Sequence, residues 1–179
     1  MRVGIIADTH ISDRRRSIPS AVWRAFEQCD CILHAGDVSR KEVLDELSLL
    51  APVHAVHGNV DAPELLRSLP ATRVLDLNGV VIGLTHGHLG RGRSTRERAL
   101  GLFDGVNGLA AVVFGHSHEP CNELAGNVLQ FNPGSPTERR RQARHSCGLL
   151  RISDGDVRGE IVISSGDLRL RRWPCYDGC

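Results

Sequence analysis

The sequence predicts an α/β fold in a single domain over residues 1–179. Strand-like and helix-like patterns alternate as far as Ser68, which is typical of βαβ units. Beyond that point, short strand-like runs separated by turn dipeptides indicate mostly antiparallel strands. No repeat, linker or low-complexity segment divides the chain, and 179 residues is an ordinary size for one domain.

The first part of the chain supplies the strands expected to pair in parallel. Nearly continuous apolar runs, as found in strands covered on both faces, are predicted at Arg2–Ala7, Asp30–Ala35 and Val53–His57. Helical spacing of apolar residues predicts helices from Ala21 to about Gln28, from Ser39 to the stop at Pro52, and over Pro63–Ser68. A hydroxyl of the Ser17–Ser20 segment and that of Ser39 are expected to cap the first two helices.

The second part is expected to contain two hairpins, with turns at Asn78-Gly79 and Asp154-Gly155. Their strands are predicted at Arg73–Leu77, Val80–Thr85, Gly148–Ser153 and Val157–Ser164. Between the hairpins, the pattern predicts a helix over Thr95–Phe103 and strands over Ala110–Phe114 and Val128–Asn132.

Composition narrows the class of protein. A net charge of +1 argues against a general nucleic-acid binder, and an aromatic content of 4% argues against base stacking along a single strand. No apolar run is long enough to cross a bilayer, and Asp8 interrupts the first one too early for a signal peptide. We therefore expect a cytoplasmic protein that binds no membrane.

Six cysteines are present, and none forms a Cys-x-x-Cys pair. Without a secretory signal they are expected to be reduced thiols that pack as small apolar groups. Cys175 and Cys179 near the chain end could pair or bind a metal, and the sequence leaves their role open.

Metal-binding residue types follow the predicted strands at five places. They are Asp8 and His10, then Asp37, Asn59, His86, and finally His116 and His118. In an open α/β sheet the carboxyl ends of the strands form the ligand site, and mixed carboxylate, amide and imidazole ligands suit divalent transition metals. The neighbouring glycines, which allow the backbone to turn sharply and approach an ion closely, are Gly36, Gly58, Gly87 and Gly115.

These motifs, in this order, resemble those of the calcineurin-like metallophosphoesterase superfamily. The resemblance extends to about Pro136 and rests on Asp8-x-His10, Gly36-Asp37, Gly58-Asn59, His86-Gly87-His88 and Gly115-His116-x-His118. The short chain, Asn59-Val60-Asp61 and Asn132-Pro133-Gly134-Ser135 are similar to the YfcE-type phosphodiesterase branch. The fold that this implies is a four-layer sandwich, in which two mixed β-sheets pack face to face and are flanked by helices.

The resemblance also implies a pair of divalent ions. One ion would be held by Asp8, His10 and His118 and the other by Asn59, His86 and His116, with Asp37 bridging them. Manganese is the expected metal, although iron, zinc, nickel or cobalt would tolerate the same ligands. The implied activity is that of a phosphoric ester hydrolase, in which hydroxide bound by both ions attacks a small phosphodiester or a related phosphate ester.

Three residues are assigned catalytic roles: Asp37, Asn59 and His88. The Asn59 amide is expected to bind metal through its oxygen and donate its NH2 group to a phosphate oxygen. Many superfamily members have a histidine where this chain has Val60, and an aliphatic side chain donates no proton. Leaving-group protonation must then come from water or another residue, for which His88 and His57 are the candidates.

Other polar residues have alternative interpretations. His88 either orients a ligand or contacts substrate, and Asp61 either caps the following helix or orients a ligand. His34, His54 and His145 are expected to be structural. The arginine clusters are interpreted mainly as solvated surface, but those at 14–16 and 91–98 follow metal motifs directly, so a basic rim with Arg14 contacting substrate is expected there.

Two other functions compete with the small-molecule phosphodiesterase. A eukaryotic retromer subunit with a similar fold serves as a non-catalytic scaffold, but a scaffold would be expected to lose ligands, and here the whole set is present. A nuclease would keep the chemistry, although the near-neutral charge argues against it. The physiological substrate and the oligomeric state, including a homo-oligomer, are left open.

Overall fold

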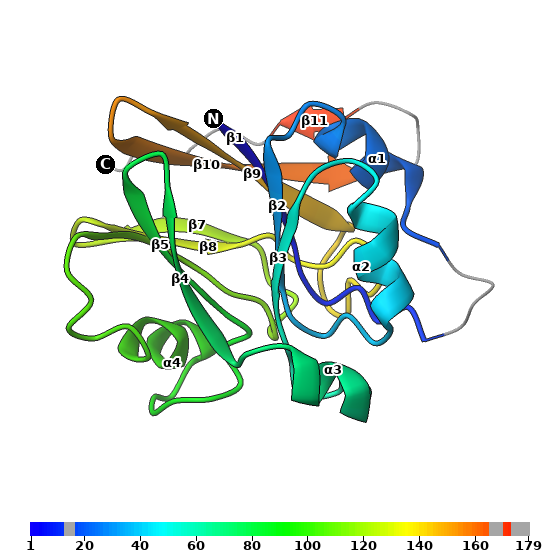
Figure 1. Cartoon of the computed structure of the whole chain (residues 1–179), viewed down its shortest axis with the longest axis horizontal. Helices are drawn as coiled ribbons and strands as arrows, with labels where there is room; N and C mark the ends of the chain where they lie inside the picture. The colour runs from blue at the N-terminus through cyan, green and yellow to red at the C-terminus, as the bar shows by residue number, and fades with distance from the viewer. Residues whose placement is uncertain (13–16, 165–169, 173–179) are drawn as a thin grey trace.

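The computed structural model describes residues 1–12, 17–164 and 170–172, whose strands form two sheets (Figure 1). The first has the order β11-β10-β9-β1-β2-β3 and the second the order β4-β5-β6-β8-β7. The strands of the first sheet are β1 (Arg2–Ile6), β2 (Cys31–Ala35), β3 (Val53–Val56), β9 (Ser146–Ser153), β10 (Asp156–Ser164) and β11 (Leu170–Arg172). Those of the second are β4 (Thr72–Leu77), β5 (Val80–Thr85), β6 (Leu109–Val113), β7 (Cys121–Ala125) and β8 (Val128–Asn132).

Both sheets are mixed. β1, β2 and β3 pair in parallel, whereas β9 pairs antiparallel with β1 and β10. In the second sheet β6 is parallel to β5 and β8, and the flanking strands β4 and β7 are antiparallel to their neighbours. Parallel strands include β1, β2 and β3 in the first sheet and β5 and β6 in the second. Their carboxyl ends reach the same end of the molecule.

Helices cover the outer faces of the two sheets (Figure 1). They are α1 (Ser20–Phe26), α2 (Lys41–Leu47), α3 (Pro63–Ser68) and α4 (Thr95–Gly101). Alternate residues of β1 enter different cores: Val3 and Ile5 face the second sheet, and Ile6 packs with residues of α1 and α2. A third apolar cluster joins Ala99 and Phe103 to β6. The predicted four-layer sandwich is therefore confirmed.

Both predicted hairpin turns are present. Asn78 and Gly79 have φ of 54° and 81°, and Asp154 and Gly155 have φ of 53° and 77°. Two successive left-handed residues are the geometry of the turn that best matches the twist of the flanking strands. The glycine in each pair adopts it without strain, which is why these dipeptides are strong hairpin signals.

Several sequence expectations about the fold were wrong in detail. α1 and α2 have Pro19 and Arg40 at the N-cap position, and no side chain caps either helix. α2 ends at Leu47, because residues 48–51 form turns before Pro52. β7 and β11 were not predicted; β7 is a half-exposed edge strand joined to β8 by a two-residue turn at Gly126-Asn127.

Among the described residues, no helix has the length and apolar character that crossing a membrane requires. Cys29, Cys31, Cys121 and Cys147 are free thiols, and burial is the main cause that raises their pKa, to about 12 for Cys147. They therefore pack as the expected apolar groups. Cys175 and Cys179 lie outside the described residues.

Candidate metal centre

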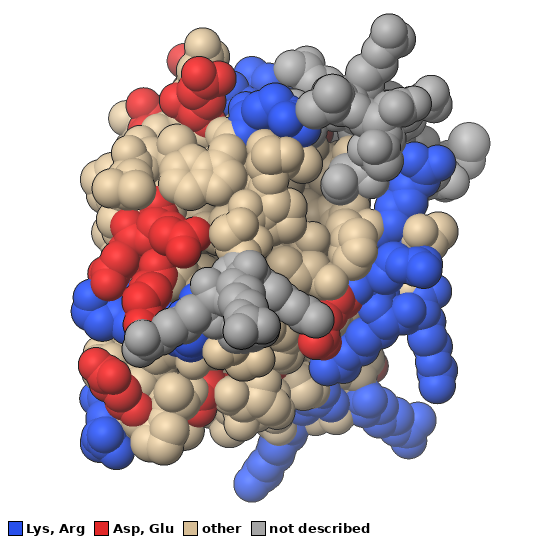
Figure 2. All heavy atoms as spheres, turned by 90° about the vertical axis from the view of Figure 1, so that its right-hand side faces the viewer, with Lys and Arg blue, Asp and Glu red and all other residues tan. Residues whose placement is uncertain are grey.

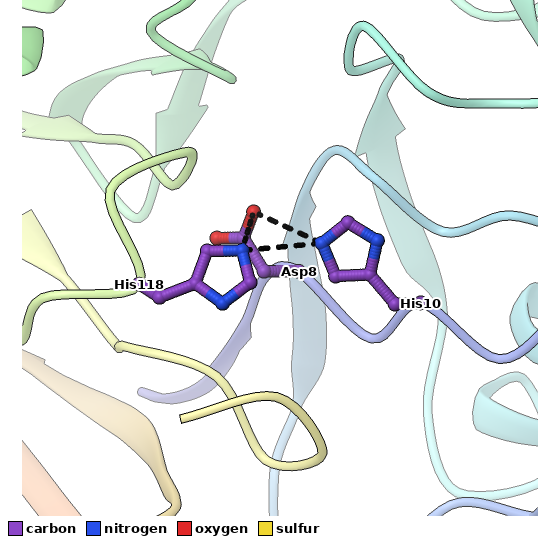
Figure 3. Close-up of side chains that lie close together, drawn as sticks. All are labelled: Asp8, His10 and His118. Atoms are coloured by element: carbon purple, nitrogen blue, oxygen red, sulfur yellow. Dashed lines mark hydrogen bonds and ion pairs between the residues drawn. The ribbon is translucent and has the colours of Figure 1, made fainter. Parts of the chain in front are cut away.

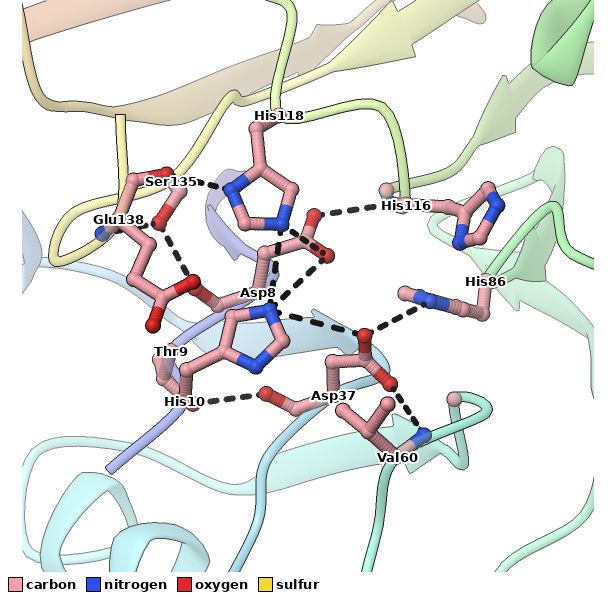
Figure 4. Close-up of polar contacts among 12 residues, drawn as sticks. Asp8, Thr9, His10, Asp37, Val60, His86, His116, His118, Ser135 and Glu138 are labelled. Atoms are coloured by element: carbon pink, nitrogen blue, oxygen red, sulfur yellow. Dashed lines mark hydrogen bonds and ion pairs between the residues drawn. The ribbon is translucent and has the colours of Figure 1, made fainter. Parts of the chain in front are cut away.

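The seven predicted ligands come together where strands of both sheets end; Figure 4 shows six of them, and the seventh, Asn59, lies next to His86. Asp8 and His10 follow β1, Asp37 follows β2, and Asn59 follows β3, while the second sheet contributes the three remaining histidines. Backbone φ is positive at five of the seven, namely Asp8, His10, Asp37, His116 and His118. Non-glycine residues rarely adopt this conformation, and such strain concentrates at functional sites.

Asp8, His10 and His118 form a compact group of three (Figure 3). The two Nε2 atoms of His10 and His118 are 3.1 Å apart, and Asp8 Oδ1 lies 3.3 Å from His118 Nε2 and 3.8 Å from His10 Nε2. Asp8 Oδ1 is buried and makes no hydrogen bond of normal geometry. A buried carboxylate oxygen facing two imidazole nitrogens fits a divalent cation.

Asp37 lies between this group and the remaining ligands. Its Oδ2 atom is 3.6 Å from His10 Nε2 and 3.2 Å from His86 Nε2, and its Oδ1 atom accepts a hydrogen bond from the Val60 N–H at 3.1 Å. Asp8, Asp37 and His86 form a second group that could hold a cation. The carboxylate of Asp37 is thus placed to face two cation positions at once.

Asn59 and His116 lie next to His86 of the second group. Asn59 Oδ1 lies 3.2 Å from His86 Nε2, and the rings of His86 and His116 meet edge to face with centroids 5.1 Å apart. The His116 N–H donates to Asp8 Oδ2 at 2.9 Å, which joins the loop after β6 to the loop after β1. These side chains surround the same opening as Asp37 Oδ2, as Figure 4 shows for His86 and His116.

Backbone carbonyls orient two of the imidazoles. His86 Nδ1 donates to the Ala35 carbonyl at 2.8 Å, and His118 Nδ1 donates to the carbonyl of Glu138. Because the Nδ1 atom carries the proton in each ring, the Nε2 lone pair is left free and points into the site. This arrangement is the usual one for histidine ligands of metals.

The pKa values of these groups show mutual stabilisation of opposite charges. Burial alone would raise the pKa of Asp8, but the nearby imidazoles of His10 and His118 outweigh it and hold that pKa well below its ordinary range. Burial would lower the pKa values of His10 and His86, but Asp8 and Asp37 raise both. The pocket therefore stabilises positive charge next to its carboxylates, as a cation site requires.

His88 lies at the edge of the second group. Its ring centroid is 5.2 Å from that of His86, 5.9 Å from that of His57 and 6.3 Å from that of His116. Burial, followed by the neighbouring imidazoles, lowers the pKa of His88 to about 4, so the ring is neutral at pH 7. Its buried Nδ1 atom has no hydrogen-bond partner among the described residues. Arg14 lies outside the described residues.

Residues of the 132–138 segment also support the centre. Ser135 Oγ donates to the Asp8 carbonyl at 2.7 Å, and Thr137 Oγ1 donates to the Thr9 carbonyl at 2.5 Å. Asn132 Nδ2 donates to the Gly115 carbonyl at 2.9 Å. Sequence reasoning missed the role of Thr137, because the contact spans 128 residues and has no local signal.

His34 and Thr9 form a further buried support. His34 is fully buried, and its Nε2 atom lies 3.2 Å from Thr9 Oγ1, which in turn lies 3.2 Å from the Val38 carbonyl. Burial lowers the pKa of His34 to about 4, so it is a neutral donor at pH 7. The structural interpretation of His34 is confirmed: from β2 it holds the Thr9 hydroxyl, which joins the loop after β1 to the loop after β2.

Asp61 orients ligands and does not cap α3, which settles the two alternatives. Its Oδ2 atom accepts from the Gly58 N–H at 2.7 Å and its Oδ1 atom from the Ser39 N–H at 2.6 Å, while the N-cap position belongs to Ala62. The side chain is 5% exposed. It therefore fixes the loop that carries Asn59 against the loop that carries Asp37.

We expect Asp61→Asn to weaken metal binding about 10- to 100-fold and to cost about 2 kcal/mol of stability, because an NH2 group would then oppose a buried N–H. Metal titration and urea unfolding measure the two effects. Asp76→Asn is the matched control, since Asp76 accepts one exposed bond from the Gly79 N–H far from the centre. Unchanged metal affinity in the Asp61 variant would show that the loops hold their positions without this carboxylate.

Comparison with known proteins identifies the family. The profile described as the calcineurin-like phosphoesterase superfamily domain matches residues 1–155. The chain belongs to this superfamily. This family implies divalent metals, which agrees with the unpartnered Asp8 oxygen and the converging imidazoles.

Two archaeal relatives and one bacterial relative show how far the superfamily match extends. A probable metallophosphoesterase of Methanothermobacter thermautotrophicus is 39% identical over 163 residues, covering 90% of this chain and 92% of the relative. A phosphodiesterase of Methanocaldococcus jannaschii is 31% identical over 150 residues, covering 75% of this chain and 83% of the relative. The bacterial phosphodiesterase YfcE of Escherichia coli is 32% identical over 118 residues, covering 63% and 58%.

Two solved structures show how closely the fold of this chain agrees with known folds. Vps29 of Entamoeba histolytica, in a structure complexed with zinc, superposes with a TM-score of 0.79 at 26% identity and covers 97% of this chain and 98% of that one. An archaeal phosphodiesterase superposes with a TM-score of 0.66 at 23% identity, covering 90% of this chain and 99% of that one, and supports the fold alone.

Proposed function

We propose that this chain is a metal-dependent phosphodiesterase that hydrolyses a small phosphodiester or a related phosphate ester. The observation that carries the proposal is the set of atoms around Asp8 and Asp37: a buried carboxylate oxygen without a hydrogen bond, and two imidazole Nε2 atoms on either side of a second carboxylate. The phosphodiesterase names of two relatives support the same activity.

The residues present fit a pair of divalent ions. We propose Asp8, His10 and His118 as ligands of one, Asn59, His86 and His116 as ligands of the other, and Asp37 as the ligand that both share, with manganese as the expected metal. When bound, the ions supply the positive charge that neutralises the phosphate and lower the pKa of a coordinated water.

The chain's own residues have further tasks in this proposal. Asn59 presents its amide oxygen towards His86, which leaves the NH2 group to donate to a phosphate oxygen and hold the substrate in line. His88 is neutral and borders the second group, so its imidazole N–H is placed to donate to substrate without adding charge. Asp37 keeps its orientation through the Val60 N–H.

Metal analysis combined with hydrolysis assays tests the proposal. We expect purified protein to bind about two divalent ions per chain and to hydrolyse bis(p-nitrophenyl) phosphate, with a rate that rises on addition of manganese. The likeness to Vps29 favours a scaffold as the second candidate. Metal binding without hydrolysis of any ester, under any ion, would favour the scaffold, whereas cleavage confined to oligonucleotides would favour a nuclease.

The side chain after Asn59 determines the preferred leaving group. Val60 is 53% exposed beside the site, and its side chain has no proton to donate to a leaving group. We therefore expect diesters with acidic leaving groups to react at least about 100-fold faster than alkyl monoesters. Val60→His should narrow this difference about tenfold or more, because the new imidazole can protonate an alkoxide.

A Val74→His variant is the matched control for the leaving-group experiment, since Val74 is 52% exposed on β4 and remote from the site. Initial rates with p-nitrophenyl and alkyl esters measure the effect. Equal rates on both ester classes in the wild type would show that some other group already protonates the leaving oxygen.

A further inference from the structure

Positive charge is distributed unevenly over this nearly neutral chain. Figure 2 shows Lys and Arg side chains concentrated along one side of the face drawn, with most Asp and Glu side chains on the other side. Residues 138–144 contain four exposed arginines and one exposed glutamate, a local charge of +3 against +1 for the whole chain. We call this segment the arginine turn; its arginines are Arg139, Arg140, Arg141 and Arg144.

The arginine turn is attached directly to the metal centre. The carbonyl of Glu138, its first residue, accepts the hydrogen bond from His118 Nδ1. Thr137, one residue earlier, donates to the Thr9 carbonyl between two proposed ligands. Since these contacts fix the start of the turn against the centre, the guanidinium groups that follow are held close to the place where a phosphodiester would react.

Internal contacts brace the turn. The Gln142 N–H donates to the Arg139 carbonyl at 2.8 Å, and Arg139 Nη1 donates to the carbonyls of Gln142 at 2.9 Å and Ala143 at 3.3 Å. The Arg139 side chain therefore stabilises the conformation of the turn. This leaves Arg140, Arg141 and Arg144 as the cations that the turn presents to solvent, and Arg140 and Arg141 are the adjacent pair among them.

Arg140 has an unusual backbone conformation, with φ of 48°. Its Nη1 atom lies 3.5 Å from the carbonyl of His116, at the long limit of a hydrogen bond, and it forms no ion pair with a described residue. A left-handed arginine costs free energy, and such strain is usually retained where it serves a function. The guanidinium of Arg140, which has no anionic partner within the described part of the chain, lies next to the loop after β6.

Arg91 and Arg93 of the 91–98 cluster are exposed, but the other two arginines of the cluster are less suited to binding a ligand. Arg96 forms an ion pair with Glu123 and a hydrogen bond with Gln130. Arg98 donates to the Gly87 carbonyl and to Thr95 Oγ1, each at 3.1 Å. These guanidinium groups already have acceptors, so the basic rim expected there is better supported at the arginine turn.

We propose that Arg140 and Arg141 bind a second phosphate group of the substrate, so that the preferred substrate is a small phosphodiester carrying an additional phosphate monoester. Guanidinium groups pair with phosphate oxygens in bidentate geometry, and a monoester dianion is attracted more strongly than the diester monoanion. The inference rests on the proposed phosphodiesterase function and specifies its substrate class.

Two chromogenic esters that differ by one phosphate test this inference: thymidine 5′-(p-nitrophenyl phosphate) and the same compound with a 3′-phosphate. Both release p-nitrophenol from the same reacting group. We expect the manganese-loaded wild type to show a kcat/KM about fivefold higher for the 3′-phosphorylated ester, through a lower KM, and this preference to shrink at high ionic strength.

An Arg140→Gln/Arg141→Gln double variant should lose the preference. The ratio of kcat/KM between the two esters is the readout, so it does not depend on the fraction of folded enzyme. Arg158→Gln is the matched control, since Arg158 is exposed in the β9–β10 hairpin, next to a turn at the opposite end of the first sheet, and should keep the ratio of the wild type.

Each alternative outcome is distinguishable. Hydrolysis of both esters with equal efficiency by the wild type, or an unchanged ratio in the double variant, overturns this inference alone. If the variant lost cleavage of a single-stranded oligonucleotide while the two small esters reacted equally, a nucleic-acid ligand would replace the small substrate. If the wild type hydrolysed bis(p-nitrophenyl) phosphate but neither thymidine ester, this inference alone would fail. If it hydrolysed none of the three esters, the proposed function would fail as well.

Discussion

An Asp37→Asn variant is expected to lose at least about 1,000-fold in kcat/KM towards bis(p-nitrophenyl) phosphate and to bind metal much more weakly. The substitution preserves shape, and the amide oxygen can still accept from the Val60 N–H that now bonds to Oδ1. The new NH2 group would occupy the position of Oδ2, which lies 3.6 Å from His10 and 3.2 Å from His86. A neutral donor there opposes a cation instead of binding it.

The control for this variant is Asp45→Asn, the same substitution on the exposed face of α2. Asp45 pairs with Lys41 at 2.6 Å, and an ion pair as exposed as this one contributes little to stability. Metal content by mass spectrometry and steady-state kinetics distinguish the two variants. Full activity of Asp37→Asn with both ions retained would mean that Asp37 is not the shared ligand.

Local sequence patterns were sufficient to predict most strands, because buried parallel strands are apolar on both faces and hairpin dipeptides have distinctive backbone angles. β7 escaped prediction because two of its residues are exposed and its polar residues obscure any apolar alternation. The Gly126-Asn127 turn was the available signal. The prediction that Ser39 caps α2 was wrong. Its N–H donates to Asp61, its φ is 75°, and it precedes the N-cap residue Arg40.

The candidate ligands were predictable for a different reason. Each follows a strand within a few residues, so strand order and direction alone bring them to one end of the molecule. The supporting contacts were not predictable, because they join distant segments: Ser135 reaches Asp8 across 127 residues, and His34 reaches Thr9 from the next strand. The type of a residue does not indicate which distant residue it will hydrogen-bond to, because that depends on how the sheets pack together.

Gly58 belongs to a motif that the sequence predicted, and it is also a point of close contact between two distant loops. Its replacement by alanine is expected to have the second large effect on activity. A Cβ atom at this position would lie 2.0 Å from Asp37 Oδ1 and 2.5 Å from the Asp37 backbone nitrogen. Neither atom can yield without moving the carboxylate away from His10 and His86. Because a displacement of about 1 Å at a reacting centre can cost about 100-fold, we expect a loss of at least about that size in kcat/KM.

Gly101→Ala provides the comparison for the Gly58 experiment, since a Cβ at the end of α4 would meet nothing closer than the Arg91 carbonyl oxygen at 4.0 Å. That variant should keep its activity and gain stability slightly, as alanine favours helix over glycine by about 1 kcal/mol. Kinetics, metal titration and thermal unfolding of both variants give the measurement. If Gly58→Ala bound metal and hydrolysed ester like the wild type, the loop after β3 could shift without disturbing Asp37, and the close approach of the two loops would not be required for the site.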